Sequence, residues 1–416
     1  MFKKILALTL TVLMLATLCV SFASCGKTRL GESEDLLPRN EITSNVQIPS
    51  DFKIGLITLH DENSTYDKNF IDAFLQVVRA LGIPESNYFI VKNIDEDTIC
   101  YDTAIDLANR GCKVVFADSF GHEVFMKQAA QEKPDVQFCH ATGVTAKSTA
   151  DTIPNFHNAF AAIYEGRFVA GVVAGLKLNE MIESGKIKAE EAIMGYVGAF
   201  TYAEVVSGLS SFYLGAKSVC PSVTMKVTYT GSWYDQGAEQ EAANMLIKQE
   251  KCVLISQHAD SLGAPTACQK AKVPNVSYNG STYNAGKDTW LVSSAINWAP
   301  YFQYIIEKTA KGETFDTDWT GTIATNSVVL SGLNLDVIAE GTQEKVAEVI
   351  KGLKEGTIHV YDVDTFTVEG KKLTSEDCEY VHDGYFDESN AATYISAPYF
   401  DKVIDGITYL NTNFGD

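Results

Sequence analysis

The feature that most constrains the fold is an alternation of short apolar runs with amphipathic segments, which occurs twice along the chain. The first series opens with the apolar run at residues 52–59, and the second opens with a similar run at residues 192–197. Strands that alternate with helices form parallel sheets covered by helices. The sequence therefore predicts an α/β fold with two doubly wound parallel-sheet lobes joined by a hinge.

The restart of the alternation also predicts the domain boundaries. Residues 51–162 and 289–316 are assigned to lobe I, because the strand and helix after residue 289 are expected to return to it. Residues 163–288 and 317–416 are assigned to lobe II. From residue 340 onward the sequence is irregular and rich in Asp, Tyr and Thr, so this assignment is loose and no role is predicted there.

The N-terminal sequence has the pattern of an export signal. Two lysines precede an apolar run at residues 5–20, and small residues stand directly before Cys25. This is the pattern of a secretory signal peptide, and a cysteine at the cleavage point indicates a lipoprotein, although Phe22 stands where an aliphatic residue is usual. We expect residues 1–24 to be the signal, Cys25 to carry the lipid, and the protein to lie on the outer face of the cytoplasmic membrane. An ordinary signal peptide is the alternative.

Residues 25–50 are polar and contain two prolines but little periodicity. Such a composition is typical of a flexible tether, which would hold the folded part away from the membrane. No later segment approaches the 18 or so continuous apolar residues of a membrane span. The lipid is therefore expected to be the only membrane attachment.

Charge and motifs narrow the classes of function. The net charge of −20 argues against nucleic acid as a partner. Of the nine cysteines, Cys19 leaves with the signal and Cys25 is the anchor, and no pair among the rest has CxxC spacing. No dinucleotide fingerprint, P-loop or HExxH motif occurs. We expect no cofactor and no metal site, and the sequence leaves open one or two disulfides.

In doubly wound sheets, ligands bind beyond the carboxyl ends of the strands. Two such lobes place the site in the cleft between them, and binding is expected to close the lobes about hinges near residues 160, 290 and 316. The turns after the predicted strands are rich in aromatic, carboxylate and amide side chains and contain no Arg. The candidate ligand-binding residues are Tyr66, Asp67, Asn69, Ser119, Phe120, Phe200, Trp233, Asp235, Asp260, Asn279, Asn297 and Trp298.

The composition of these turns favours one class of ligand. Aromatic faces pack on flat rings, and Asp, Asn and Ser form hydrogen bonds with ring edges. A phosphate or carboxylate ligand would need Arg or Lys. A neutral or cationic polar ring compound is therefore expected. The alternative is that the aromatic residues fill the lobe cores and that the Asp and Ser residues cap helices.

Seven stretches carry a resemblance to a known family. They are VFADSFG at 115–121, PDVQFCHATG at 134–143, YEGRFVAG at 164–171, GYVGAF at 195–200, SWYD at 232–235, QHADS at 257–261 and NWAPY at 297–301. Over residues 52–335 the chain resembles the basic membrane protein family of solute-binding lipoproteins, components of importers for purines and nucleosides. The resemblance implies a type I periplasmic-binding fold and an ABC permease with its ATPase as partners. A monomer is expected.

The resemblance also bears on the choice between nucleobase and nucleoside. Nucleoside-binding members place an Asp after the strand that corresponds to residues 275–278, and a Lys at the start of the helix that corresponds to residues 299–311. Here the matching positions are Asn279 and either Asn297 or Trp298. An amide and an indole thus replace a charged pair that holds ribose hydroxyls, so a free purine base is expected to bind better than its nucleoside.

Two other functions compete with solute delivery. The turn at residues 117–121 imitates a nucleophile elbow, so Ser119 could serve a lipid-anchored serine hydrolase, with His258 downstream. A ligand-sensing lipoprotein with a membrane receptor as partner would share the fold and the ligand. Because the second lobe has no role in a hydrolase, the favoured interpretation is a binding protein and not an enzyme.

Overall fold

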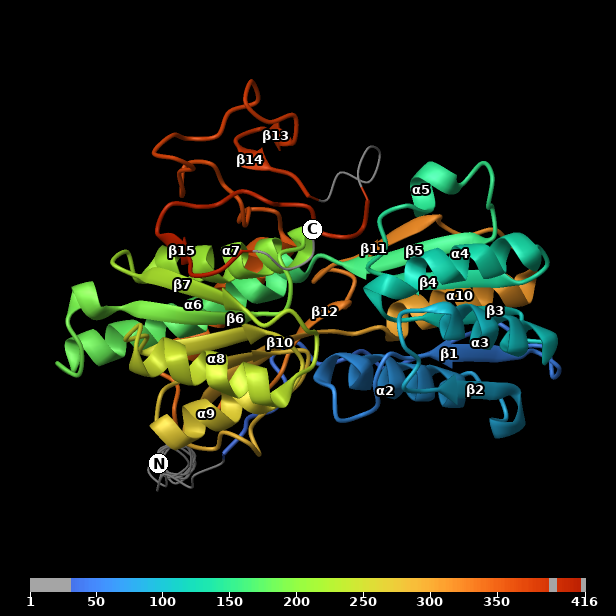
Figure 1. Cartoon of the computed structure of the whole chain (residues 1–416), viewed down its shortest axis with the longest axis horizontal. Coiled ribbons are helices and arrows are strands. Elements are labelled where there is room, and N and C mark those ends of the chain that lie inside the picture. The colour runs from blue at the N-terminus through green and yellow to red at the C-terminus, as the bar shows by residue number, and fades with distance from the viewer. Residues whose placement is uncertain (1–30, 389–394, 413–416) are drawn as a thin grey trace, which may run out of the picture.

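The computed structural model describes residues 31–388 and 395–412, in which two sheets lie side by side with helices packed against each (Figure 1). The two sheets confirm the two predicted α/β lobes. The predicted signal peptide at residues 1–24 and the predicted lipidation site, Cys25, lie outside the described residues. Within the described ranges, no helix combines the length and the hydropathy needed to span a membrane.

Lobe I is built on a six-stranded parallel sheet in the order β11-β5-β4-β3-β1-β2. Alternate residues of a strand face opposite sides of the sheet, so Val114 and Phe116 join one core cluster while Val115 and Ala117 join another. The strands are β1 (Ile54–Ile57), β2 (Tyr88–Val91), β3 (Val114–Ala117), β4 (Gln137–Ala141), β5 (Phe156–Ala161) and β11 (Asp318–Gly321). The helices are α2 (Thr65–Ala80), α3 (Thr98–Asn109), α4 (Glu123–Glu132), α5 (Ala146–Thr149) and α10 (Ala299–Lys311).

Lobe II is built on a seven-stranded sheet in the order β12-β10-β9-β8-β6-β7-β15, parallel except for β12. Its strands are β6 (Ile193–Gly198), β7 (Thr224–Tyr229), β8 (Leu254–His258), β9 (Asn275–Tyr278), β10 (Trp290–Ile296), β12 (Val328–Leu330) and β15 (Ile407–Tyr409). Its helices are α6 (Ile163–Glu183), α7 (Ala203–Val219), α8 (Gln236–Lys248), α9 (Gly263–Ala271) and α11 (Thr342–Lys354).

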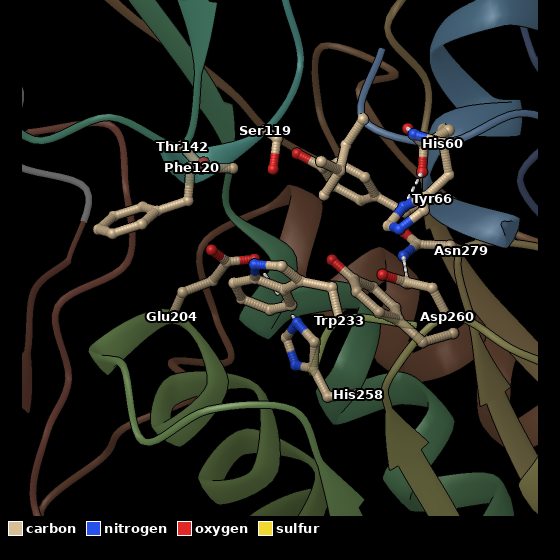
Figure 2. Close-up of a pocket in the computed structure, with 13 residues that line it drawn as sticks. His60, Tyr66, Ser119, Phe120, Thr142, Glu204, Trp233, His258, Asp260 and Asn279 are labelled. Atoms are coloured by element: carbon tan, nitrogen blue, oxygen red, sulfur yellow. Dashed lines mark hydrogen bonds and ion pairs between the residues drawn. The ribbon is translucent and has the colours of Figure 1, made fainter. Parts of the chain in front are cut away.

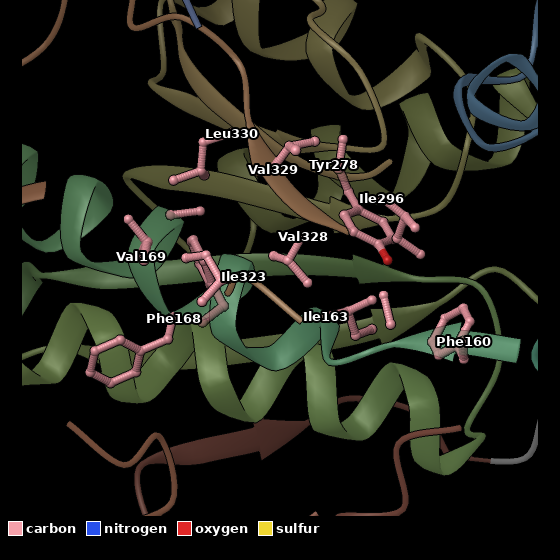
Figure 3. Close-up of a cluster of buried hydrophobic side chains, with 14 of the residues drawn as sticks. Phe160, Ile163, Phe168, Val169, Tyr278, Ile296, Ile323, Val328, Val329 and Leu330 are labelled. Carbon is pink, nitrogen blue, oxygen red and sulfur yellow. The ribbon is translucent and has the colours of Figure 1, made fainter. Parts of the chain in front are cut away.

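Glycines allow helices α6 and α7 to pack backbone against backbone. A Cβ on Gly171 would lie 2.1 Å from the carbonyl oxygen of Phe212, and one on Gly215 would lie 2.0 Å from that of Phe168. Apolar side chains at the start of α6 and on β12 continue the core between the lobes (Figure 3). One hydrophobic core is therefore continuous from lobe I to lobe II.

The chain passes from one sheet to the other after β5, β10 and β11, and two of these crossings correct the prediction. The sequence assigns residues 289–316 to lobe I, but β10 pairs with β9 in the second sheet. It assigns residues after 317 to lobe II, but β11 pairs with β5 in the first sheet. Periodicity identifies a strand but does not say which sheet edge it joins.

The predicted tether also needs correction where the structure describes it. Residues 25–30 lie outside the described residues, but Leu37 forms a bridge with Leu330, the last residue of β12, and Glu32 forms one with Asn334 just after it. The Leu37 side chain is only 5% exposed. The segment at residues 31–48 is therefore packed on the folded body, and we call it the N-terminal strap.

The residues after α11 form an addition to lobe II, drawn in red in Figure 1. It contains the short strands β13 (Val381–His382) and β14 (Tyr385–Phe386), and the rings of Tyr361 and Phe400 stack with centroids 4.1 Å apart. Its Glu388 carboxylate accepts a hydrogen bond from Ser207 Oγ of α7 at 3.0 Å. The aromatic residues of the addition therefore continue the main hydrophobic core, as the contact of Tyr361 with Tyr164 of α6 also shows.

The seven cysteines within the described ranges are all buried and unpaired. Within residues 31–388 and 395–412, no group of His, Cys, Asp or Glu side chains is arranged to hold a metal ion.

Candidate ligand-binding site

A pocket lies between the two lobes and contains about 380 Å³ of empty space, part of which is open to solvent. It lies beyond the carboxyl ends of parallel strands from both sheets, which is where doubly wound sheets bind their ligands. We call this principle the strand-end rule. Lobe I contributes Leu59, His60, Tyr66, Asp67, Ser119, Phe120 and Thr142. Lobe II contributes Glu204, Trp233, His258, Asp260, Tyr278 and Asn279, and Figure 2 shows most of these side chains together.

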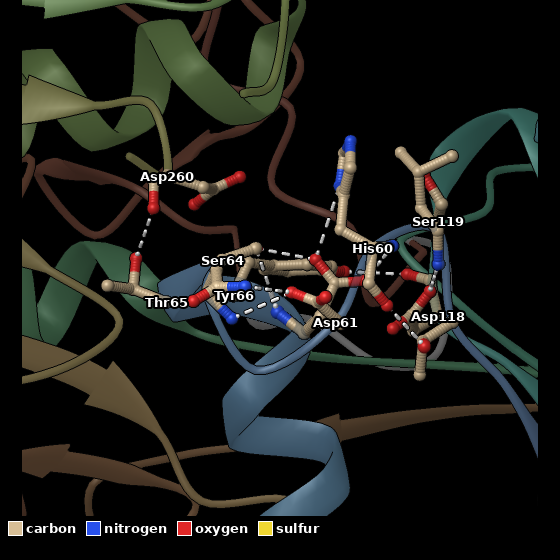
Figure 4. Close-up of polar contacts among 12 residues, drawn as sticks. His60, Asp61, Ser64, Thr65, Tyr66, Asp118, Ser119 and Asp260 are labelled. Atoms are coloured by element: carbon tan, nitrogen blue, oxygen red, sulfur yellow. Dashed lines mark hydrogen bonds and ion pairs between the residues drawn. The ribbon is translucent and has the colours of Figure 1, made fainter. Parts of the chain in front are cut away.

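The start of helix α2 fixes Asp67 at the cavity wall. Ser64 caps the helix, because its Oγ accepts a hydrogen bond from the Asp67 backbone N–H at 3.2 Å. The same hydroxyl donates to Asp67 Oδ2 at 2.5 Å, and the backbone N–H of His60 donates to Oδ1 at 2.7 Å (Figure 4). Burial alone would raise the pKa of Asp67, but the contacts from His60 and Ser64 hold it below its usual value. Asp67 is therefore an ionised, fully engaged carboxylate.

The carboxyl pKa values of Asp118 and Asp260 are shifted in the opposite direction to that of Asp67. Burial, with the nearby charge of Asp67, raises the pKa of each carboxyl well above its usual value. Asp260 Oδ1 accepts a hydrogen bond from Asn279 Nδ2 at 3.0 Å. Burial thus favours the protonated form of the Asp260 carboxyl, which can donate a hydrogen bond as well as accept one.

Several polar atoms of the cavity residues are buried without a hydrogen-bond partner among the described residues. They are Thr142 Oγ1, Tyr278 Oη, Asn279 Oδ1 and His258 Nδ1. Thr142 also has a φ of 68°, which is a strained conformation for a β-branched residue. Because buried polar atoms in native proteins are nearly always paired, these atoms indicate a polar occupant.

Aromatic rings from both lobes form another part of the wall. Phe120 of lobe I lies 4.8 Å from Tyr202 of lobe II, centroid to centroid, and Trp233 packs edge-on against Phe200 at 5.0 Å. Glu204 Oε1 lies 3.5 Å from Nε2 of His258 at the cavity wall. None of the described lining residues is Arg or Lys, so the wall suits a neutral or cationic ring better than an anion.

The lobes touch directly beside the cavity. The Asp260 carbonyl oxygen accepts hydrogen bonds from the backbone N–H of Thr65 at 3.1 Å and from its Oγ1 at 3.2 Å. Asn69 Nδ2 of α2 donates to the carbonyl oxygen of Asn279 at 2.5 Å. These contacts join lobe I to lobe II, so the cleft is closed.

The structure brings together seven of the twelve predicted site residues, and they are Tyr66, Asp67, Ser119, Phe120, Trp233, Asp260 and Asn279. Phe200 packs behind Trp233, and Asn69 joins the lobes at the cavity edge. Asp235 is exposed and caps α8, its Oδ1 accepting from the Ala238 N–H at 2.9 Å. It is therefore a helix cap.

Asn297 and Trp298 lie elsewhere, at the crossing after β10. Asn297 Nδ2 donates to the carbonyl oxygen of Asn326 at 2.9 Å. The Trp298 ring is 1% exposed and stacks on Phe70 in the core of lobe I, with centroids 4.2 Å apart. The argument that an indole at this position fills the ribose space is therefore wrong.

Six lining residues were not predicted: Leu59, His60, Thr142, Glu204, His258 and Tyr278. Leu59, His60 and Thr142 follow strand ends, so the strand-end rule could have found them. His258 and Tyr278 are the last residues of β8 and β9. Glu204 lies in the first turn of α7, and no local pattern distinguishes it from an ordinary helix N-terminus.

The hydrolase alternative finds no support in the contacts of Ser119. Its Oγ donates to Glu96 Oε1 at 2.5 Å. His140 Nε2 lies 2.6 Å from the carbonyl oxygen of Ser119, and His122 Nδ1 accepts from its backbone N–H at 3.4 Å. Both nearby histidines contact the Ser119 backbone, so neither is placed as the base of a serine–histidine pair.

Comparisons with known proteins agree with this geometry. A family model, Bmp, described as an ABC transporter substrate-binding protein, PnrA-like, matches residues 55–364. A purine-binding protein of Brucella abortus is 34% identical over 253 residues, 60% of this chain and 66% of the relative. A Haloferax volcanii protein with a provisional name as an ABC transporter glucose-binding protein is 32% identical over 209 residues, 50% of this chain and 49% of the relative. The chain thus spans less than two thirds of each relative.

A solved structure supports the fold alone. An ABC transporter solute-binding protein from Conexibacter woesei matches with a TM-score of 0.58 and 22% identity, and the match covers 74% of this chain and 98% of that chain. The likeness confirms the type I periplasmic-binding fold.

Proposed function

The chain belongs to the Bmp family of PnrA-like ABC transporter substrate-binding proteins, and from this premise we propose that it binds a purine base or nucleoside in the cavity between its lobes. The bound ligand is delivered to an ABC permease and its ATPase. The cleft closes over the ligand and presents the closed face to the permease. The purine-binding name of the Brucella abortus relative supports this choice of ligand.

One observation carries the proposal: partnerless polar atoms lie beside aromatic rings on a wall that lacks Arg and Lys. A purine has flat faces that pack on rings such as Phe120 and Trp233. Its edge carries both donors and acceptors, which the Asp260 carboxyl and the Asn279 Oδ1, without a partner among the described residues, can satisfy.

The location is part of the same proposal. The protein is a lipoprotein held on the outer face of the cytoplasmic membrane through Cys25, and it acts as a monomer. Substituting Cys25→Ser is expected to move the protein from the detergent phase to the soluble fraction in phase partitioning. Detergent partitioning that is unchanged in this variant would contradict the anchor.

The ligand is tested by titration calorimetry of the purified protein with adenine, hypoxanthine, adenosine, inosine and D-glucose. At least one of the four purine compounds is expected to bind, and glucose is expected not to bind. D-Glucose is included because one relative carries a glucose-binding name. Binding of glucose, or silence from all four purine compounds, would overturn the purine assignment.

A further inference from the structure

The N-terminal strap is attached to both lobes. On lobe II, the Ser33 N–H donates to the Leu333 carbonyl oxygen at 2.9 Å, and the Leu333 N–H donates to Ser33 Oγ at 2.8 Å. On lobe I, Gln303 Nε2 of α10 donates to the Thr43 carbonyl oxygen at 2.8 Å. The strap therefore crosses the hinge in addition to the crossings after β5, β10 and β11.

Between these attachments, the strap places Arg39 beside helix α2. Arg39 Nη2 donates to Asn69 Oδ1 at 2.9 Å. Burial lowers the pKa of the Arg39 guanidinium, and the nearby Asp72 and Asp35 carboxylates partly offset this effect. Arg39 is thus held against helix α2 at Asn69.

Arg39 sets the orientation of the Asn69 amide. A guanidinium can only donate, so it selects the amide oxygen of Asn69 and turns the NH₂ group the other way. That NH₂ group donates to the Asn279 carbonyl oxygen of lobe II at 2.5 Å. Asn69 is 5% exposed, so water does not readily replace this contact.

Asn279 continues the chain of contacts into the cavity. Its φ of 66° is in the left-handed region, where the backbone needs support from its neighbours. Its Nδ2 donates to Asp260 Oδ1 at 3.0 Å, and its Oδ1 has no partner among the described residues. A displacement of Asn279 would therefore move two polar groups of the cavity wall.

We propose that Arg39 is a positioning residue for ligand capture: it orients Asn69, which holds Asn279 and the opposite lobe in the closed cleft. The role of the cavity in this inference rests on the proposed function. Without Arg39, the Asn69 amide is free to rotate and the cross-lobe contact weakens. The closed state then becomes less populated, and the apparent affinity for ligand falls with it.

The experiment measures the distance between the lobes in the ligand-free protein by double electron–electron resonance. Spin labels are attached at the exposed positions Asp102→Cys on α3 and Glu241→Cys on α8, since the seven cysteines in the described ranges are buried. The test variants are Arg39→Met and Asn69→Asp. The second keeps a partner for Arg39 but replaces the NH₂ donor to Asn279 with a carboxylate oxygen. The matched control is Gln303→Ala, which removes a strap contact outside this chain of residues.

Both test variants are expected to lengthen the interlobe distance, while the Gln303→Ala control keeps the parent distribution. Calorimetry with adenine is expected to show about tenfold weaker binding in both, which corresponds to about 1.4 kcal/mol. Unchanged distances in both test variants would overturn the proposal. A longer interlobe distance in Arg39→Met alone would also overturn the proposal, and so would an equal increase in Gln303→Ala. Either result would mean that Arg39 only attaches the strap to lobe I. If the parent protein binds no purine, the proposed function fails, but the distances still decide the role of Arg39.

Discussion

Two substitutions of Asp260 separate the two protonation states of its carboxyl. Asp260 is 6% exposed, and its Oδ1 accepts a hydrogen bond from Asn279 Nδ2 at 3.0 Å. Burial raises the pKa of this carboxyl well above its usual range, and the charges of Asp67 and Glu239 raise it further. The protonated form is therefore expected to face the ligand.

The magnitude follows from the contacts that each substitution removes. Asp260→Ala removes the ligand contact and leaves the Asn279 NH₂ group without an acceptor. Losing one partner of a buried neutral hydrogen bond costs about 1–3 kcal/mol, which is about 5- to 150-fold in affinity. Asp260→Asn keeps an acceptor for Asn279 and offers an N–H donor in place of the O–H donor. We therefore expect Asn to retain affinity within about threefold of the parent value.

The assay is calorimetry with adenine at pH 6 and pH 8, with the exposed helix cap substituted in Asp235→Ala as the control. Because the carboxyl pKa is raised in the closed cleft, the protonated form is favoured at low pH. Affinity should therefore fall as the pH rises through that raised pKa, and Asp260→Asn should lose this dependence. An Asn variant as weak as the Ala variant would show that Asp260 acts as an ionised acceptor. Parent affinity in Asp260→Ala would refute its contact with the ligand.

Three further predictions concern the core and the tail. Trp298→Ala should cost about 3–5 kcal/mol of unfolding free energy in urea, whereas Trp233→Ala should weaken adenine binding and leave the urea midpoint near the parent value. Gly215→Ala should destabilise the protein by about 1–3 kcal/mol or more, because the new Cβ would meet the Phe168 carbonyl oxygen at 2.0 Å. Burial raises the pKa of Glu388 from 4.5 to about 8, so its contribution is complete below pH 4.5 and is lost as the pH rises towards 8. The urea midpoint of Glu388→Gln should therefore fall less between pH 5 and pH 8 than that of the parent, and an equal fall would refute this assignment.

The strand-end rule accounts for the part of the site that the sequence could predict. Ser119 and Asp260 lie two residues beyond the ends of β3 and β8, so the direction of the chain at the strand end brings them to the cavity. The rule needs only the order of strands and helices, which the periodicity supplies. For this reason the fold and seven site residues were accessible without coordinates.

The rule fails where the side chain turns away from the cleft. Trp298 also follows a strand, but the chain crosses to lobe I at that point, and its ring stacks on Phe70. Asp235 follows β7 but caps the next helix in solvent. The sequence predicts that aromatic and acidic residues lie near the cleft. Whether each side chain points into the cleft, into a core or into solvent depends on how the two lobes are assembled.

The N-terminal strap is the part of the structure that is hardest to predict from its own sequence. Residues 31–48 lack the apolar periodicity of an element with its own core, and a polar composition of this kind predicts disorder. Their order comes from partners far along the chain: the Asn40 N–H donates to Asn326 Oδ1, 286 residues away, and the Leu333 N–H donates to Ser33 Oγ, 300 residues away. Polar side chains and an edge strand satisfy the backbone of the strap, so no local pattern needs to encode it. A polar composition shows only that such a segment has no core of its own. Contacts with the two lobes order the strap, and this order allows Arg39 to contribute to the closed cleft.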